Sequence, residues 1–525
     1  MITEDQTEVI EFLSNPNTYG LGDRIVERIQ THGAIVFLAG SRAYKLKRAV
    51  WFEYMDFSTV EHRRKFCAAE IEINVRTAPE IYLGSRAIIR NSDGRMSFAP
   101  ADQSLSGLDV VDWVVEMARF DQEALFDRLA ERGVLSNALM IALTDQICAF
   151  HENAEIRNDQ GGRQAHQRVI DTNHTQLEHY SGAIFDREKV EALKTASDTE
   201  LENCHHEIDR RRGAGLVRHC HGDMHLRNIC LFGGRPTLFD GIEFDDQIAC
   251  VDVLYDLAFL LMDLIERDLT GFANLVLNHY LFTTATADYE KWCGIACLPL
   301  FLSCRAGVRA HVSAATAESC AQSGEAEIHK TRARSYLEAA LLYLEPAAPH
   351  LIAVGGLSGS GKSILAGALC PQLGRAPGAI WVRSDVIRKR LAGVEPSDRL
   401  GIDNYTATMN RRVYEIMRET TARVLNCGHS VVVDAVFAHE KERLVFEEIA
   451  KKIDVNFTGI WLTAPRDTLV RRIDQRKIDN KDPSDATVGV LDRQLSYELG
   501  NMRWNVVDAS GTEGETLCRA KQVIN

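Results

Sequence analysis

A glycine-rich loop over residues 356–363 is the feature that most constrains how this chain can fold. It fits the pattern G-x-x-x-x-G-K-[ST] without a mismatch, between an apolar strand over 351–354 and a helical stretch over 364–369. Its glycines allow backbone N–H groups to turn inward around phosphate oxygens, and the following helix adds a partial positive charge. This context favours a nucleotide phosphate site over a chance loop of small residues. The predicted contacts are Gly356, Leu357, Ser358, Gly359, Ser360, Gly361, Lys362 and Ser363.

Four polar side chains in this region carry the predicted chemistry. Lys362 can reach the β- and γ-phosphates of a nucleotide, and the Ser363 hydroxyl can ligate Mg²⁺. Asp434 ends an apolar strand, which predicts a second Mg²⁺ ligand, with a capping role at the strand end as the alternative. Asp385 follows an earlier strand, at the edge of a sheet where ligands bind, and can deprotonate an acceptor hydroxyl.

Two arginines complete this set. Arg472 and Arg476 are four residues apart in a helical stretch, so they share one helix face. They can clamp a phosphoryl group during its transfer, and an ordinary solvated face is the alternative. Strands near Ile380, Val431 and Ile460 alternate with helical stretches, which predicts an α/β domain with a parallel sheet.

Residues 351–510 resemble the P-loop kinase group, which includes gluconate kinases, zeta toxins, chloramphenicol phosphotransferase and the kinase half of polynucleotide kinases. The matching residues are the loop over 356–363, Ser384-Asp385 with Arg388, Asp434, and the Arg472/Arg476 pair. The resemblance implies transfer of the γ-phosphate of ATP to a hydroxyl, with Asp385 as the base on the acceptor side.

A second phosphate-transfer pattern precedes the first along the chain. Residues 221–228 fit H-x-D-x-x-x-x-N, which lets Asp223 face an acceptor hydroxyl while Asn228 reaches Mg²⁺. An apolar strand then delivers Asp240 as a second metal ligand, after a hairpin around Gly233-Gly234. Two alternatives remain open, a metal cluster of His221, Asp223 and His225, and a purely structural loop.

This second pattern resembles the aminoglycoside phosphotransferase and choline kinase families, which share the protein-kinase fold. The resemblance covers roughly residues 30–340 and implies that a lysine of the strand over 43–47 holds the α- and β-phosphates of ATP. Lys45 and Lys47 both fit, and Lys47 is favoured narrowly; Glu70, on the next helix, is the expected ion-pair partner, with a solvated surface position as the alternative.

Other parts of the same region match the families or depart from them. The strand over 113–117 resembles the hinge that contacts adenine, and Asp252 and Asp256 resemble buried supports of the catalytic loop. The region departs from the protein-kinase pattern in having no G-x-G-x-x-G loop, since only Gly40 marks the first hairpin.

The chain therefore divides into two predicted domains. Residues 1–345 form an α+β protein-kinase-like domain with a small β-rich lobe and a large helical lobe, in which residues 1–30 are a polar helical lead-in. Residues 351–525 form an α/β P-loop NTPase domain with a parallel sheet. The linker lies near 345–350, where two prolines end the preceding helix.

Composition narrows the partners and the compartment. The net charge of −14 disfavours nucleic acid and anionic membranes, because neutralising phosphates requires a basic face. The N-terminus lacks the features of a secretory signal, the apolar runs are too short to span a membrane, and the 13 cysteines contain no CxxC pair. We expect a cytoplasmic protein with reduced thiols.

Two functional hypotheses follow. In the first, the chain is a bifunctional kinase that uses ATP and Mg²⁺, and each domain phosphorylates a hydroxyl of a small molecule such as a sugar, cyclitol or amino alcohol. In the second, one domain is a nucleotide-binding regulator of the other, or acts on a protein or RNA. The intact set of Asp223, Asn228 and Asp240 favours the first hypothesis. The sequence leaves the acceptors and the oligomeric state open.

Overall fold

The computed structural model describes residues 3–31, 33–52, 55–99, 105–284, 292–320, 323–394, 400–479 and 487–524, with the backbone alone at 323, 402, 403 and 476–479. The chain forms two compact units. Unit 1 comprises Met1–Arg168 and Asp209–Arg267, and unit 2 comprises Val169–Ile208 and Asp268–Asn525.

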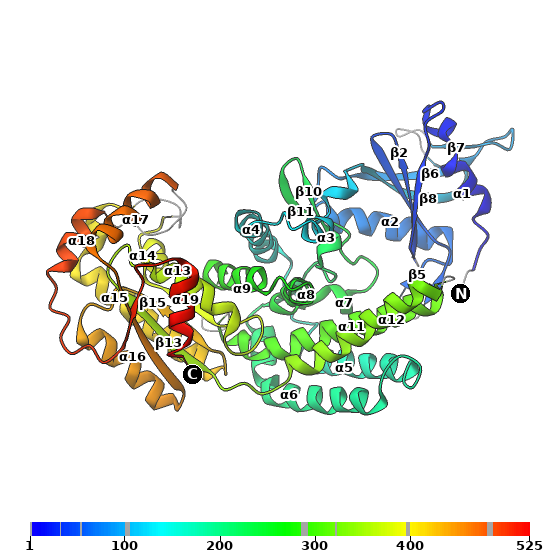
Figure 1. Cartoon of the computed structure of the whole chain (residues 1–525). Coiled ribbons are helices and arrows are strands. Elements are labelled where there is room, and N and C mark those ends of the chain that lie inside the picture. The colour runs from blue at the N-terminus through cyan, green and yellow to red at the C-terminus, as the bar shows by residue number, and fades with distance from the viewer. Residues whose placement is uncertain are drawn as a thin grey trace. The chain divides into compact units, whose positions relative to one another are not determined.

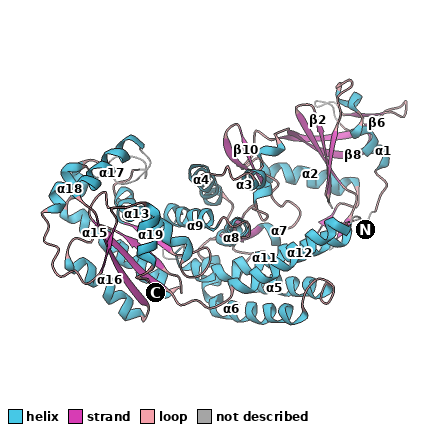
Figure 2. Cartoon of the chain, viewed as in Figure 1, coloured by secondary structure: helices cyan, strands magenta, loops and turns pink. Residues whose placement is uncertain are grey.

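Unit 1 contains an antiparallel sheet of six strands in the order β1-β2-β3-β8-β6-β7. Its strands are β1 (Glu27–Gln30), β2 (Ala34–Ala39), β3 (Arg42–Lys47), β6 (Tyr82–Arg90), β7 (Met96–Phe98) and β8 (Asp109–Ala118). The predicted hairpin at Gly40 is present, and Gly40 has the positive φ that such a turn requires. A second hairpin joins β6 to β7 through residues 91–95. Helix α2 (Val60–Asn74) lies against this sheet (Figures 1 and 2).

The prediction of a helical lead-in over residues 1–30 is wrong in part. Helix α1 (Thr7–Ser14) and a 3₁₀ turn (Pro16–Tyr19) are followed by strand β1, which pairs with β2. Every residue of β1 is exposed, so the strand has no alternation of apolar and polar residues that could reveal it. A short hairpin, β4 (Trp51–Phe52) with β5 (Met55–Asp56), was also not predicted.

The second half of unit 1 carries the predicted catalytic region. Strand β9 (Val217–His219) pairs with β12 (Cys250–Asp252), and the predicted hairpin is formed by β10 (Ile229–Phe232) and β11 (Arg235–Leu238). Helices α3 (Phe126–Glu131) and α4 (Asn137–Asn153) precede this region, and α7 (Asp246–Ala249) and α8 (Val253–Ile265) follow it. Between α4 and β9 lie α5 (Gly162–His179) and α6 (Arg187–Gly213), and residues 169–208 of this stretch belong to unit 2.

Unit 2 begins its second segment with helices. Helix α9 (Thr270–Thr284) is followed by α11 (Leu298–Ser319) and α12 (Ser323–Tyr343), and the last two pack along one another (Figure 1). Within the described residues, one segment, Gly294–Ser319, passes the length and hydropathy test for a membrane span. Since 72% of its most apolar window is buried inside the structure, this is weak evidence for a span.

The remainder of unit 2 is the predicted α/β domain. Its five strands are all parallel, in the order β14-β15-β13-β16-β17. They are β13 (His350–Gly356), β14 (Ile380–Arg383), β15 (Val431–Asp434), β16 (Asn456–Thr463) and β17 (Asn505–Asp508). The helices are α13 (Lys362–Leu369), α14 (Ser384–Leu391), α15 (Ala407–Asn426), α16 (Glu440–Ile453), α17 (Arg466–Asp479), α18 (Val488–Leu495) and α19 (Glu513–Lys521). The predicted fold class is thereby confirmed.

The compact units do not divide at the predicted linker over 345–350. Unit 2 contains residues from both sides of it, and Glu200 of α6 forms an ion pair of 3.0 Å with Arg375, which lies beyond the linker. The His429 ring, also beyond the linker, lies 2.8 Å from the carbonyl oxygen of Ile295. A functional division into residues 1–345 and 351–525 therefore stays a prediction, and it does not coincide with the packing.

We expect Gly459 to be indispensable for packing beside the P-loop strand. Gly459 lies in β16, the strand that pairs with β13. A Cβ added to it would lie 2.3 Å from Cγ of the buried Trp504. Gly459→Ala should therefore lower the free energy of unfolding by about 1–3 kcal/mol. Denaturant unfolding measures this. The matched control is Gly514→Ala in α19, where nothing lies within 4 Å of the added Cβ. Equal unfolding midpoints for the two variants would contradict the expectation.

Candidate functional site

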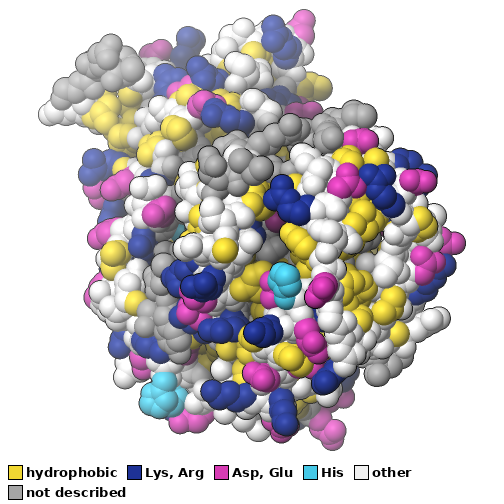
Figure 3. Space-filling model, turned by 90° about the vertical axis from the view of Figure 1, so that its left-hand side faces the viewer, with side chains coloured by type: hydrophobic (Ala, Val, Ile, Leu, Met, Phe, Trp, Pro, Cys, Tyr) yellow, Lys and Arg dark blue, Asp and Glu magenta, His cyan; other side chains and the backbone are white. Residues whose placement is uncertain are grey.

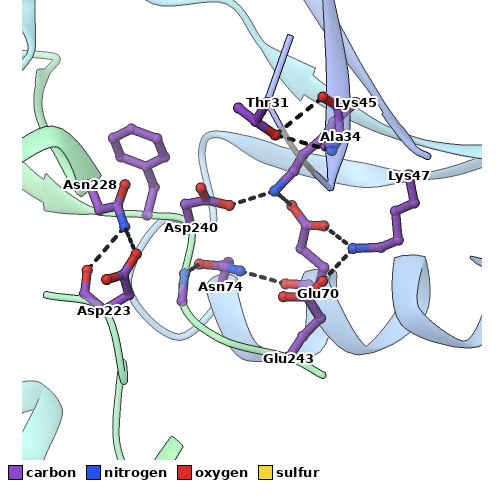
Figure 4. A network of polar contacts seen from close by, with 12 residues as sticks. Thr31, Ala34, Lys45, Lys47, Glu70, Asn74, Asp223, Asn228, Asp240 and Glu243 are labelled. Carbon is purple, nitrogen blue, oxygen red and sulfur yellow. Dashed lines mark hydrogen bonds and ion pairs between the residues drawn. The ribbon is translucent and has the colours of Figure 1, made fainter. Parts of the chain in front are cut away.

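The first candidate site is built around two lysines on one face of strand β3. Alternation along the strand points Lys45 and Lys47 the same way. Both bind Glu70 of α2, with Lys45 Nζ 2.8 Å from Oε1 and Lys47 Nζ 2.6 Å from Oε2. Lys45 also contacts Asp240 Oδ1 at 2.5 Å, and Lys47 contacts Glu243 (Figure 4). Glu70 is thus a single carboxylate shared by two ammonium groups.

Burial and charge decide the protonation states in this cluster. The Glu70 side chain is 0% exposed, which alone would raise its pKa, but the two lysines outweigh burial and hold the pKa at about 2. Burial would lower the pKa of Lys45, yet Asp240 and Glu70 raise it well above its ordinary value. Burial raises the pKa of Glu243 despite the opposing charge of Lys47. Glu70 is therefore ionised, and both lysines carry their charge.

The two lysines differ in what surrounds them. The Lys47 side chain is 1% exposed and lies over the Phe57 ring, with Glu243 on its other side. The Lys45 side chain is 15% exposed and faces Asp240, the predicted metal ligand. The sequence favours Lys47 as the phosphate lysine, whereas this geometry favours Lys45. Glu243 was not predicted, although it follows Asp240 by only three residues in the same loop.

Asp240 adopts a backbone conformation that is rare for residues other than glycine, with φ of 62°. Three neighbours hold this turn: the Tyr82 hydroxyl accepts the Asp240 N–H at 3.1 Å, and Asn74 Oδ1 accepts the Gly241 N–H at 2.8 Å. The Asn228 carbonyl accepts the Phe239 N–H at 3.0 Å. Sequence alone cannot reveal such a turn, because its supports come from distant segments.

The predicted catalytic loop brings Asp223 and Asn228 together. Asn228 Nδ2 donates to Asp223 Oδ2 at 2.9 Å and to the Asp223 carbonyl at 3.0 Å (Figure 4). Asp256 of α8 accepts the N–H groups of His221 and Gly222 at 3.2 and 2.9 Å, which matches the predicted support of this loop. Asp223 and Asn228 are therefore oriented by their mutual hydrogen bonds, and the start of the loop is held by the buried Asp256.

Asp252 does not support the catalytic loop directly, in contrast to the expectation. Its carboxylate pairs with the buried Arg211, with two contacts of 2.7 Å, and caps the N-terminus of α8 by accepting the Leu254 N–H. The residue that contacts the loop beside Asp256 is Asp263, whose Oδ2 accepts the Leu226 N–H at 3.0 Å.

The alternative of a metal cluster at His221 and His225 gains no support. His221 Nε2 lies 2.9 Å from the Phe239 carbonyl, so this ring contacts the backbone. Among the described residues, two groups of three potential ligands lie close together, and neither contains His221, His225 or Asp223. They are His151, Cys220 and Asp256, and His219, Asp246 and Cys250.

The second candidate site is the glycine-rich loop between β13 and α13. Gly356, Gly359 and Gly361 have φ of 145°, 81° and 92°, in the region that favours glycine. A Cβ on Gly359 would lie 2.6 Å from the Leu469 carbonyl, so space as well as backbone angle requires glycine there. Lys362 Nζ donates to the Leu357 carbonyl at 3.1 Å, within the loop itself.

Ser363 and Asp434 meet as predicted for a Mg²⁺ site. The Ser363 hydroxyl donates to Asp434 Oδ2 at 2.6 Å, and Arg383 Nε lies 3.9 Å from the same carboxylate oxygen. Burial raises the pKa of Asp434, although Arg383 and Lys362 oppose that shift. A hydroxyl and a carboxylate are the oxygen donors that Mg²⁺ prefers, so the residues present fit this ion.

The predicted acceptor-side residues lie at the carboxyl end of β14. Asp385 is in the first turn of α14, directly after β14, and Arg383 is in register with Asp434 of β15. Arg388, one turn beyond Asp385, is buried, lies over the Tyr405 ring and donates to the Asn404 carbonyl at 3.3 Å. This is the sheet edge at which ligands of parallel α/β folds bind.

Of the two arginines predicted to clamp a phosphoryl group, the structure describes the side chain of only one, Arg472. Arg472 Nη2 donates to the Gly511 carbonyl at 2.9 Å, and Arg472 Nη1 would lie 3.9 Å from a Cβ on Gly361, so it borders the glycine-rich loop. The Arg476 side chain lies outside the described residues, and only its place in α17 is known. Gln494 of α18 was not predicted, and its Oε1 accepts the Ser358 N–H at 2.8 Å.

Comparison with known proteins supports the C-terminal assignment. Residues 351–498 match the sequence model of a family described as an AAA domain. The chain is 26% identical over 506 residues to proteins of Mycobacterium tuberculosis and Mycobacterium bovis that are named only as uncharacterized, with 94% of each chain covered.

Two solved structures are similar to separate parts of the chain. A gluconokinase from Sinorhizobium meliloti is 23% identical and covers 34% of this chain and 91% of its own, with a TM-score of 0.25. A choline/ethanolamine kinase family protein from Mesorhizobium loti is 12% identical and covers 65% of this chain and 98% of its own, with a TM-score of 0.37. At these TM-scores the likenesses assign neither enzyme's substrate to this chain.

We expect Glu70→Gln to leave two buried ammonium groups without their shared counter-charge. Removing one partner of a buried ion pair costs about 3–5 kcal/mol, so the variant should lose that amount of unfolding free energy at pH 7. Glu72→Gln, at an exposed position on the same helix, is the matched control and should change little.

The pH dependence of this loss gives a second measurement. The pKa of Glu70 is about 2 in the folded chain and about 4.3 when unfolded, so the ionised group stabilises fully above the unfolded value. That stabilisation is lost as the pH falls toward 2. The stability difference between the parent and Glu70→Gln should therefore narrow below about pH 5. A difference that is constant from pH 7 to pH 4 would contradict the ion-pair role.

Residues 351–498 thus match a family described as an AAA domain and contain the glycine-rich loop with Ser363 and Asp434, while a separate cluster of lysines and acids lies in the region before them.

Proposed function

We propose that the chain is a bifunctional phosphotransferase in which each domain transfers the γ-phosphate of ATP to a hydroxyl of a small molecule. The observation that carries this proposal is that each site pairs a lysine and metal-type oxygen ligands with a separate acid on the acceptor side. The first set is Lys45, Asn228 and Asp240 with Asp223, and the second is Lys362, Ser363 and Asp434 with Asp385.

In the first site, the contacts support Lys45 as the ligand of the α- and β-phosphates, held by Glu70. Asp240 and Asn228 supply the oxygen ligands for Mg²⁺, whose charge would neutralise the phosphates when bound. Asp223 accepts the proton of the acceptor hydroxyl while the new oxygen–phosphorus bond forms and the bond to the β-phosphate breaks, releasing ADP. Lys47 and Glu243 form a second buried pair that keeps Glu70 in place.

In the second site, backbone N–H groups of 356–363 and the Lys362 ammonium hold the β- and γ-phosphates. Ser363 and Asp434 hold Mg²⁺, and Arg472 lies where it can stabilise charge on the transferring group. Asp385 orients and deprotonates the acceptor hydroxyl, and the bonds formed and broken are the same as in the first site.

Small-molecule acceptors fit the surface better than nucleic acid does. On the face shown in Figure 3, basic and acidic side chains are interspersed among the described residues, rather than segregated into one basic area. The overall charge of −14 points the same way. A cytoplasmic location remains an expectation from the sequence.

Nucleotide stoichiometry tests the claim of two sites. Calorimetric titration of the full chain with ATP and Mg²⁺ should show two binding events, and Lys362→Ala should remove or greatly weaken one, because it deletes a positive charge beside the phosphates. Lys451→Ala, at an exposed lysine of α16, is the control and should leave both events. Unchanged binding in Lys362→Ala would contradict the role of the glycine-rich loop.

A pair of variants tests the roles assigned in the first site, with Lys362→Ala present to silence the second. Asp223→Asn should lower the transfer rate by about 10²–10⁴-fold while ATP still binds, since it removes the base but no metal ligand. Asp240→Asn should weaken Mg²⁺-dependent ATP binding itself.

Transfer is measured as the mass gain of one phosphoryl group in a pool of hydroxylated metabolites, beside the calorimetric titration. Equal loss of nucleotide binding in both variants would show that Asp223 is not the acceptor-side group. Full transfer by Asp223→Asn would make the first domain a binding module, and the regulatory hypothesis would replace this one.

A further inference from the structure

Strand β14, which leads into Asp385, is an edge strand of the parallel sheet. It pairs with β15 on one side, where the Ile380 N–H donates to the Ser430 carbonyl at 2.9 Å. The neighbouring Ala379 carbonyl and Trp381 N–H point to the other side, because alternate residues of a strand direct their hydrogen-bonding groups to opposite edges. Buried groups of this kind need partners.

Two asparagines of helix α9 supply those partners. Asn278 Oδ1 accepts the Trp381 N–H at 2.7 Å, and Asn278 Nδ2 lies 3.3 Å from the Ala379 carbonyl. Asn274 Nδ2 donates to the same carbonyl at 3.0 Å. The carboxamide of Asn278 therefore offers one acceptor and one donor, as a single residue of an adjoining strand would.

The arrangement is buried and internally braced. Asn274 and Asn278 are 4% and 7% exposed, and their spacing of four residues places them on one face of α9. Asn278 Nδ2 lies closer to Asn274 than to β14, at 3.0 Å from the Asn274 carbonyl and 3.1 Å from Asn274 Oδ1. Two buried asparagines cost desolvation energy unless they are bonded, so their contacts with β14 account for their presence in an otherwise apolar helix.

We propose that Asn278, with Asn274, is a positioning residue of the P-loop kinase site. Helix α9 takes the place of a neighbouring strand at the edge of the sheet and holds β14 in position. Through β14 it also positions Arg383 and Asp385, although α9 precedes the predicted linker. The catalytic consequence rests on the proposed function of Asp385, whereas the structural part does not. The P-loop site thus extends to a helix that sequence comparison would assign to the other kinase.

Hydrogen exchange tests the structural part directly in the full chain. In Asn278→Leu, which keeps the approximate volume but removes both polar groups, the Trp381 N–H loses its acceptor. Exchange in a peptide covering residues 379–391 should accelerate by about tenfold or more. Thr283→Ala, an exposed position on α9, is the matched control and should leave this exchange unchanged. Unchanged exchange in Asn278→Leu would overturn the proposal.

A second variant separates this hydrogen-bond pair from general packing. In Asn278→Asp, the ionised carboxyl accepts the Trp381 N–H but repels the Ala379 carbonyl, whereas the protonated carboxyl can donate to that carbonyl. Protection of β14 relative to the parent should therefore recover as the pH is lowered from 8 to 5. Among the described residues, the titratable or charged groups nearby include Arg383 over the Trp381 ring, Arg390 over the Phe282 ring, and His279, which follows Asn278 on α9. A defect that is independent of pH would overturn the strand-mimic geometry.

The catalytic part is tested by kinetics of the second site, with Asp223→Asn silencing the first. Asn278→Leu should lower the transfer rate at saturating ATP by about tenfold or more, while the ATP affinity stays within about twofold, because β13 and the glycine-rich loop are not touched. Faster exchange at β14 with unchanged transfer would overturn the positioning role. Absence of transfer in the parent chain would instead refute the proposed function and leave the exchange result standing.

Discussion

Glu70 is the residue on which the first site depends. A carboxylate with no exposed surface is tolerated because two ammonium groups share its charge, and each of those lysines is held by a further acid. The cluster joins a strand, a helix and the loop after β11, so it sets the spacing between Lys45 and Asp240, the residues proposed to hold phosphate and metal. The cluster gathers two ammonium groups and three carboxyl groups, and burial raises the pKa of one of these carboxyls, Glu243.

In the second site, a buried carboxylate beside the candidate phosphate site is compensated by fewer charged groups. Its phosphate cradle is made of backbone N–H groups, and a single buried acid, Asp434, is balanced by a serine hydroxyl and by Arg383 at 3.9 Å. Burial raises the pKa of Asp434, so a divalent ion that binds there competes with a proton more than it would at an exposed acid. Asp385, the proposed acceptor-side acid, follows the adjacent strand β14, so the sheet sets its separation from Asp434.

Sequence predicted those parts of the molecule whose residues are close together along the chain. The glycine-rich loop, the loop from His221 to Asn228 and the strands around them were identified because spacing alone specifies them. The choice between Lys45 and Lys47 depends on Glu243 and Phe57, which alternation along the strand cannot reveal. Gln494 and Asn278 were missed for a related reason: a lone amide on a helix has no pattern, and its partner is 100 or more residues away. Exposed β1 has no periodicity at all, so it was assigned to a helical segment.

The two edges of the parallel sheet show why a helix from before the linker is needed. At the β17 edge the strand has mainly exposed residues, so water can satisfy its outward groups, and Val506 is largely exposed. At the β14 edge the outward groups belong to the buried Ala379 and to Trp381, which is half-buried, and Asn274 and Asn278 bond to them. Such an edge requires either another strand or side chains that imitate one. Because Asp385, the proposed acceptor-side acid, follows β14 directly, the bonding of this edge also bears on where that acid lies. Helix α12 ends at Tyr343, shortly before the two prolines of the predicted linker, and α9, which precedes that linker, bonds to the edge strand β14 beyond it.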